Sequence, residues 1–250
     1  MSRLFDASTE VLNIDSALVT AYPFTVSAWF KSVNNTNIQT IFIVCDKDVN
    51  TNNQWRLQLR GDAAGDPIRV VSRTTSQVDA DTTTGYSINV WQHACGVFAS
   101  ATSRSAYLNG GSKGSNTTSN TPINLDRTSI GLSNDSIPDS PFLGQIAEVC
   151  VWNVELTDAE VAYLANRVSA LRIRPSNIIA YWPLYGDSSP EVDMSGKLIN
   201  LTVTGATQAD HPPIAPPFGY DVGWMGAYTV PSGGGLNIPV AMHHLRQMVG

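Results

Sequence analysis

The side chains that could carry out chemistry are few and scattered along this 250-residue chain. Three cysteines, Cys45, Cys95 and Cys150, each lie inside an apolar run typical of a buried strand, which disfavours a reactive thiolate. His93 lies two residues after Trp91 in a similar run, and we expect a packed, hydrogen-bonded histidine there. We therefore expect no activated nucleophile and no general base among these residues.

Carboxylates near turns are the next candidates, because carboxylate oxygens are the ligands that calcium prefers. Asp6, Asp46, Asp48 and Asp187 stand in or beside polar segments between apolar runs. Turns are also rich in Asp for conformational reasons. A calcium site and ordinary turn residues are both open interpretations of this pattern.

Composition narrows the class of protein. Hydrophobic residues make up 42% of the chain and charged residues 14%, with a formal net charge of -6. The sequence has no Lys/Arg cluster, so we expect neither a nucleic acid nor a membrane as a partner. The N-terminal residues lack a basic region followed by an apolar one, so we expect no secretory signal and synthesis in a reducing compartment, with the cysteines unpaired.

Periodicity predicts many strands and one helix. Residues 144–152 alternate as a strand, and residues 55–60 alternate with their apolar side chains inward. Asn109-Gly110 is a strong hairpin signal. A helix is predicted over 157–168, because Thr157 is a good N-cap and Glu160 completes a capping box.

The order of these motifs resembles a known family. The Gly at 144, the Trp at 152 and the short helix behind it are similar to the closing strand and helix of LamG-like, concanavalin A-type jelly-roll domains. Residues 91–110 resemble two central strands of the same family. The Tyr-Trp-Pro run within 178–206, which opens many family members, comes last here. The resemblance implies an all-β fold: an antiparallel two-sheet jelly-roll sandwich, circularly permuted, over residues 1–206, with one short helix.

The resemblance also implies functions. Relatives that are glucanases carry Glu-x-Asp-x-x-Glu on one strand, which the five Glu residues of this chain do not form, and Ala147 stands where the family usually has Asp. We expect no enzymatic activity. Members often bind calcium at the rim of the sandwich and sugars through exposed aromatic residues, but no feature of this sequence locates a sugar site.

The C-terminal part lies outside the resemblance. Residues 207–218 are predicted to be a Pro-rich linker, and residues 219–250 an extension for assembly or docking. The extension contains the aromatic and apolar residues expected to contact a partner: Tyr220, Trp224, Tyr228, Val240, Met242, Leu245 and Met248. A homo-oligomer is one expected outcome of such docking.

Three hypotheses follow. The first is a non-enzymatic virion structural protein of a bacteriophage, made in the host cytoplasm, that anchors to other capsid or tail proteins and displays the sandwich to host-surface glycans. The alternative is a carbohydrate-binding lectin module, with or without a dependence on calcium. The third is a glucanase-like enzyme, which the missing carboxylate motif disfavours.

Overall fold

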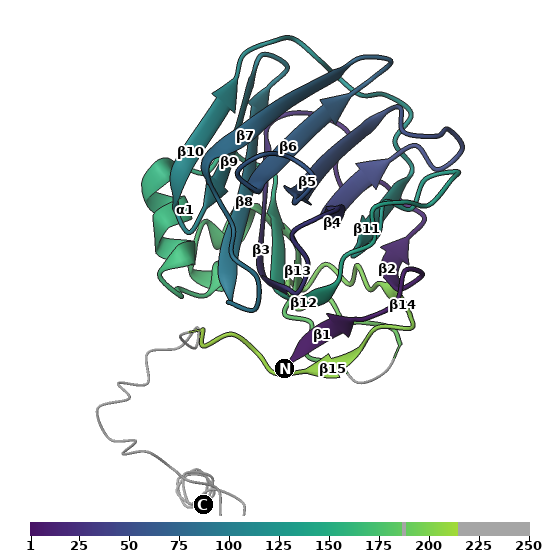
Figure 1. The fold of residues 1–250 in the computed structure, drawn as a ribbon, viewed down its shortest axis with the longest axis vertical. Coiled ribbons are helices and arrows are strands. Elements are labelled where there is room, and N and C mark those ends of the chain that lie inside the picture. Colours follow the sequence, from purple (N-terminus) through teal and green to yellow (C-terminus); the bar gives the residue numbers. More distant parts are fainter. Residues whose placement is uncertain (187–188, 215–250) are drawn as a thin grey trace, which may run out of the picture. The chain divides into compact units, whose positions relative to one another are not determined.

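The computed structural model describes residues 1–186 and 189–214, and they form two antiparallel sheets packed face to face (Figure 1). We call the sheets A and B. Sheet A has the strand order β10-β9-β8-β3-β12-β1-β15, with β13 pairing to β12, and sheet B the order β14-β2-β11-β4-β5-β6-β7. The predicted all-β, two-sheet sandwich of the jelly-roll type is confirmed.

The strands of sheet A are β1 (Ser2–Phe5), β3 (Phe24–Ser32), β8 (Gln92–Ser100), β9 (Ser103–Leu108), β10 (Gly111–Asn116), β12 (Gly144–Trp152), β13 (Ile178–Trp182) and β15 (Thr207–Ala209). Those of sheet B are β2 (Val11–Ile14), β4 (Ile38–Cys45), β5 (Gln54–Arg60), β6 (Pro67–Arg73), β7 (Gln77–Gly85), β11 (Arg127–Ile130) and β14 (Thr202–Thr204). Three short helices complete the described part: α1 (Asp158–Ala165) and the 3-10 helices Ala170–Arg172 and Pro175–Asn177.

The core lies between the sheets and is rich in aromatic rings. Phe24 of β3 stacks on Phe98 of β8 with ring centroids 4.4 Å apart, and it meets Trp55 of β5 at 5.0 Å. Such pairs add stability beyond the burial of their area. The apolar side chains of β5 point into this core, as the alternation of residues 55–60 predicts.

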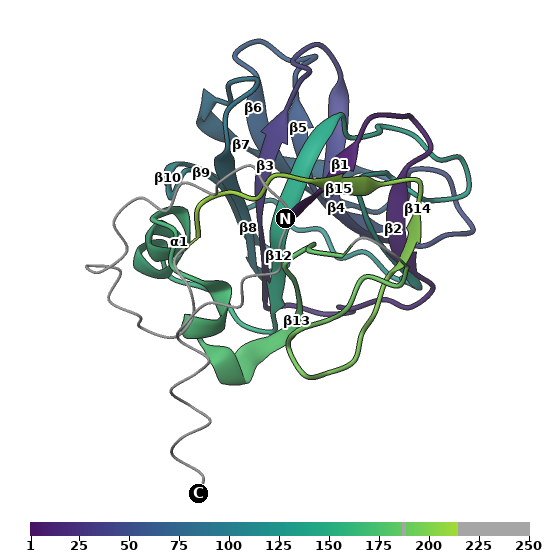
Figure 2. The ribbon, with the colours of Figure 1, turned by 90° about the horizontal axis from the view of Figure 1, so that it is seen from below.

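A second apolar cluster lies on the outer face of sheet A, where α1 covers β8 and its neighbours (Figure 2). Thr157 caps α1 as predicted, because its hydroxyl accepts from the Glu160 amide and the Glu160 carboxylate accepts from the Thr157 amide. Val161 and Leu164 then reach down to Trp152, which is fully buried. One outer face of the sandwich is thus closed by the helix.

The last three strands pair with strands of both sheets. β13 pairs with β12, β14 pairs with β2, and β15 pairs with β1. Because β15 spans Thr207–Ala209, the sandwich continues past the predicted boundary at residue 206 and into the segment predicted to be a linker. No helix of the described residues is long and apolar enough to cross a membrane.

All three cysteines are buried and unpaired, as expected. Burial raises the pKa of Cys45 to about 12 and the pKa of Cys95 above its ordinary value, so both stay thiols. They act as small apolar side chains.

Candidate functional site

The outer face of sheet B carries polar side chains across its central strands. In β5 these positions alternate with Trp55, Leu57 and Leu59, which point into the core. Register places Gln54 beside Arg73, Arg56 beside Val71, and Gln58 beside Arg69. We call this surface the polar face, and it comprises Thr40, Gln54, Arg56, Gln58, Arg69, Arg73, Asp79, Asp81 and Ser129.

Several atoms of the polar face are buried and yet make no hydrogen bond to another group of the described chain. They are Thr40 Oγ1, Gln54 Oε1, Arg56 Nε, Gln58 Oε1, Arg73 Nε, Asp79 Oδ1 and Ser129 Oγ. A buried polar atom without a partner costs about 1–3 kcal/mol, and native proteins tolerate few of them. Their concentration on one face therefore marks a place with unused hydrogen-bonding capacity.

Arg56 lies at the centre of this face. Its side chain is 8% exposed, and its contact is an ion pair of 3.7 Å from Nη1 to Asp139 Oδ1. Burial lowers the pKa of Arg56, and the nearby Asp139 and Asp135 carboxylates partly oppose that shift. A guanidinium has five donors in a rigid fork, so Arg56 keeps donors that the described chain does not use.

Arg69 forms a fixed side of the polar face. It donates from Nε to Asp81 Oδ1 at 2.5 Å and pairs through Nη1 with Asp79 Oδ2 at 2.7 Å. Burial alone would lower the pKa of Arg69, but the hydrogen bonds and charges of Asp81 and Asp79 outweigh it and raise the pKa. These carboxylates give the face acceptors as well as donors.

The loop between β11 and β12 borders the other side of the face. Ser133 and Asp139 bridge the two arms of the loop, and Thr40 of β4 donates its backbone N–H to the Ser140 carbonyl at 2.9 Å. Asp135 accepts from the backbone N–H of Thr51 at 2.8 Å. The loop is therefore tied to β4 and to the segment before β5.

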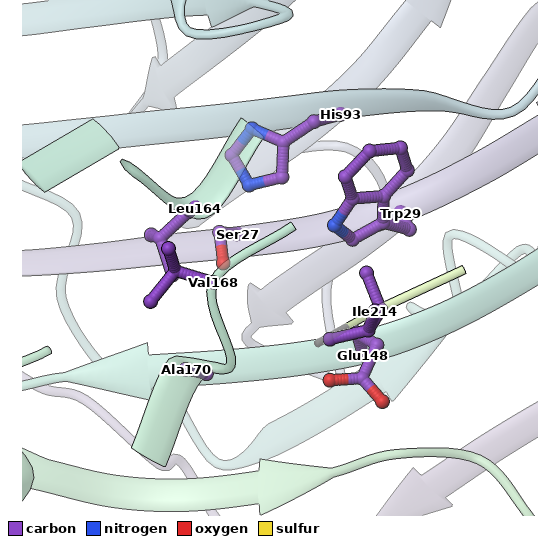
Figure 3. Close-up of a pocket in the computed structure, with 8 residues that line it drawn as sticks. All are labelled: Ser27, Trp29, His93, Glu148, Leu164, Val168, Ala170 and Ile214. Atoms are coloured by element: carbon purple, nitrogen blue, oxygen red, sulfur yellow. The ribbon is translucent and has the colours of Figure 1, made fainter. Parts of the chain in front are cut away.

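A small pocket lies on the other side of the molecule, beneath α1, and contains His93 and Glu148 (Figure 3). Its volume is about 10 Å³, which is room for one water molecule and not for a sugar. The Glu148 carboxylate turns away from His93 and is held by Tyr181 Oη at 2.7 Å and His211 Nε2 at 2.9 Å. These two residues do not form an open acid–base pair.

His93 itself differs from the prediction in one respect. It is packed, as expected, but neither ring nitrogen has a hydrogen-bond partner among the described residues. Burial lowers the pKa of His93 to about 3, so the imidazole is neutral. The predicted hydrogen bond is not made to any described residue, because the ring lies against Trp29 and under the apolar residues of α1.

Ser112 has the spacing Gly-x-Ser-x-Gly, from Gly110 to Gly114, that nucleophilic serines of hydrolases also show. That motif needs a sharp strand-to-helix turn. Here the run lies in the hairpin that begins β10, and the Ser112 hydroxyl hydrogen-bonds to Thr84 Oγ1. It does not form a nucleophile elbow.

The predicted metal ligands are only partly brought together. Asp46 and Asp48 meet Asp126, with their oxygens within 4.8 Å of one another, whereas Asp6 follows β1 in sheet A. The Lys47 ammonium donates to Asp126 and lies 3.8 Å from Asp48. The single Lys47 ammonium offsets one of these three carboxylates, and the calcium site stays a prediction.

The remaining predicted site residues lie outside the described residues. These are Asp187 of the metal prediction and the partner-docking residues Tyr220, Trp224, Tyr228, Val240, Met242, Leu245 and Met248.

A laminin G-type model of the concanavalin A-like lectin/glucanases superfamily matches residues 6–162, and the chain belongs to that superfamily. None of the curated proteins matches the sequence.

Solved structures with this fold include several carbohydrate-binding proteins. A candidate carbohydrate-binding protein from Bacteroides ovatus aligns with a TM-score of 0.58 and 20% identity, over 86% of this chain and 61% of that one. The CBM40 module of the IT-sialidase from Ruminococcus gnavus gives 0.55 and 13%, over 66% and 97%. Domain 4 of an extracellular arabinanase from Geobacillus stearothermophilus, in complex with arabinotriose, gives 0.50 and 23%, over 61% and 71%.

Sequence reasoning did not single out Gln54, Arg56 and Gln58 as functional. The alternation that placed Trp55, Leu57 and Leu59 inward also placed these three outward, which was the available signal. The alternation does not predict that these three side chains are buried, since outward polar residues are usually hydrated.

Proposed function

We propose that this protein is a non-enzymatic carbohydrate-binding protein and that the polar face of sheet B is its binding surface. The proposal rests mainly on the group of buried, unpaired polar atoms around Arg56. Membership of the lectin/glucanase superfamily and the binding modules among the similar structures support the same function.

The chemistry of the face suits a neutral, hydroxyl-rich ligand. A sugar hydroxyl both donates and accepts, and the face offers both partners. Gln54 Oε1 and Gln58 Oε1 accept, whereas Arg56 Nε donates. The arginines are balanced by Asp79, Asp81 and Asp139, so the face carries charges of both signs and does not select an anion.

The pairing of both carboxylates of this face with an arginine supports binding rather than hydrolysis. Glycoside hydrolysis needs an acid and a second carboxylate about 5–10 Å apart across the bond. Asp79 and Asp81 are both engaged by Arg69. Glu148, on the opposite sheet, is engaged by Tyr181 and His211.

The test is a glycan array followed by calorimetry with the strongest neutral oligosaccharide. Arg56→Met keeps the length of the side chain and removes its donors, and we expect affinity to fall at least tenfold, as the loss of about 1.4 kcal/mol would produce. Arg174→Met is a matched control, because Arg174 is exposed and pairs with Glu160 of α1. Equal affinity of the two variants, or no neutral glycan bound by the full chain, would overturn the proposal.

The hypothesis of a bacteriophage virion protein stays a prediction. Neither the family nor the similar structures bear on a virion, on capsid or tail partners, or on a closed homo-oligomer, although one neighbour of the same fold is a heptameric pentraxin from Limulus polyphemus. Carbohydrate binding does not depend on that hypothesis, since a sugar-binding sandwich serves on a particle or free.

A further inference from the structure

We infer that the protein has a second ligand site, in the groove between the start of β8 and the end of α1, and that this site takes a carboxylated sugar residue. The groove has a volume of about 580 Å³, within the range of roughly 300–1,000 Å³ that small-molecule sites occupy. Trp29, Trp91, Gln92, Asn109 and Arg167 are among its lining residues. It lies on sheet A and shares no residue with the polar face.

The groove is built by tight contact between a hairpin and the helix. A Cβ on Gly110 would lie 2.8 Å from the Ala162 Cα atom, so the turn between β9 and β10 fits closely under α1. Asn109 in that turn and Arg167 after the helix both have left-handed backbone angles, with φ of 52° and 69°. Such angles are uncommon outside glycine and fix these two residues at the rim.

The polar groups of the groove are oriented as donors. Asn109 Oδ1 accepts from the His93 amide at 3.0 Å, which leaves its Nδ2 group to donate. Gln92 Oε1 accepts from the Ser87 amide at 2.7 Å, which leaves Nε2. Neither amide nitrogen makes a hydrogen bond to the described residues. Because each oxygen is engaged by the backbone, these side chains cannot easily flip to become acceptors.

Charge and shape then select the ligand. Arg167 is exposed, and its guanidinium forms no ion pair or hydrogen bond with the described part of the chain. No carboxylate side chain lines the groove. Half-buried Trp91 presents an indole on which the apolar face of a pyranose ring can lie, and the donors can engage ring substituents. A sugar that carries a carboxylate suits both the Trp91 indole and the Arg167 guanidinium, because Arg pairs with carboxylates through two parallel hydrogen bonds.

The inference is tested by calorimetric titration of the full chain with methyl glucuronide and, in parallel, with methyl glucoside. We expect the glucuronide to bind at least tenfold more tightly, and this preference to shrink at high salt, because the pair with Arg167 is exposed. Arg167→Met should remove the preference, since it deletes the charge and leaves the indole.

Matched variants locate the binding in the groove. Arg174→Met removes an exposed arginine that belongs neither to the groove nor to the polar face, and it should leave glucuronide affinity unchanged. Trp91→Phe, which keeps an aromatic ring, should weaken both sugars in the groove by a similar factor. Equal binding of the two sugars, no glucuronide binding, or a preference that survives Arg167→Met would overturn the inference. Neutral-oligosaccharide binding that depends on Arg56 would survive each of those results.

Discussion

In both sheets, side chains that point into the core alternate with side chains that point outward. The two outer faces differ in what covers them. On sheet A the outward side chains include the apolar Cys95, Val97 and Trp152, and α1 covers them. On sheet B the outward side chains include Gln54 and Arg56, and several of their polar atoms have no protein partner. The helix makes one face part of the core, and the other face keeps hydrogen-bonding capacity at a cost in stability. We assign the binding of neutral sugars to the face that carries this cost.

We expect the largest loss of stability when a buried side chain is removed from the outer face of sheet A that α1 covers. Trp152→Ala removes a fully buried indole whose Nε1 donates to the Ile173 carbonyl at 2.8 Å, and we expect a loss of about 3–5 kcal/mol in the free energy of unfolding. Urea denaturation measures it. The matched change on sheet B is Gln58→Ala, for which we expect less than about 1 kcal/mol because its Oε1 atom already lacks a partner. Similar costs for the two variants would remove the distinction between the faces.

The pH dependence of stability tests the dryness of the covered face. Burial lowers the pKa of His93 to about 3, whereas histidine in an unfolded chain titrates near 6.5. Between about pH 3 and pH 6.5, His93 is protonated in the unfolded chain and neutral in the folded protein. Stability therefore falls as the pH is lowered from about 6.5 towards 3, by up to about 1.4 kcal/mol per pH unit from this residue.

Urea midpoints of the native protein and of His93→Leu, measured from pH 7 to pH 4, isolate that contribution. The variant should lose less stability over the window than the native protein. Parallel curves would mean that water or another partner reaches His93 in the folded state.

A change of opposite sign is expected on the polar face. Arg56 is buried with only a 3.7 Å ion pair, so Arg56→Met should raise the free energy of unfolding by about 1 kcal/mol while it weakens sugar binding. Thermal unfolding without ligand measures the first effect. A destabilisation of several kcal/mol would instead show that Arg56 is a structural residue of sheet B.

We expect the smallest change in stability from a substitution in α1, the helix that covers sheet A. Thr157→Ala removes the N-cap of α1 and should cost about 1 kcal/mol. Thr102→Ala, in the exposed turn between β8 and β9, is a control that should stay within about 0.5 kcal/mol. A cost for Thr157→Ala no larger than that of the control would mean that the helix contributes little to closing sheet A.

The sequence predicted the architecture better than the site. The capping box at Thr157, the turn at Asn109-Gly110 and the inward side chains of β5 are local signals, and each is confirmed in the structure. The burial of Arg56 depends on β6, β7 and the loop after β11, which local alternation does not encode. The same holds for the Asp46, Asp48 and Asp126 cluster, because Asp126 is distant in sequence from the other two carboxylates.

The most direct test of the central claim is NMR of the full chain, labelled with ¹⁵N, during titration with the strongest neutral oligosaccharide from the array. The Arg56 Nε–H signal and the side-chain amide signals of Gln54 and Gln58 should shift together and saturate with one affinity. If these signals stay fixed while signals elsewhere respond to the sugar, the polar face of sheet B is not the carbohydrate-binding surface.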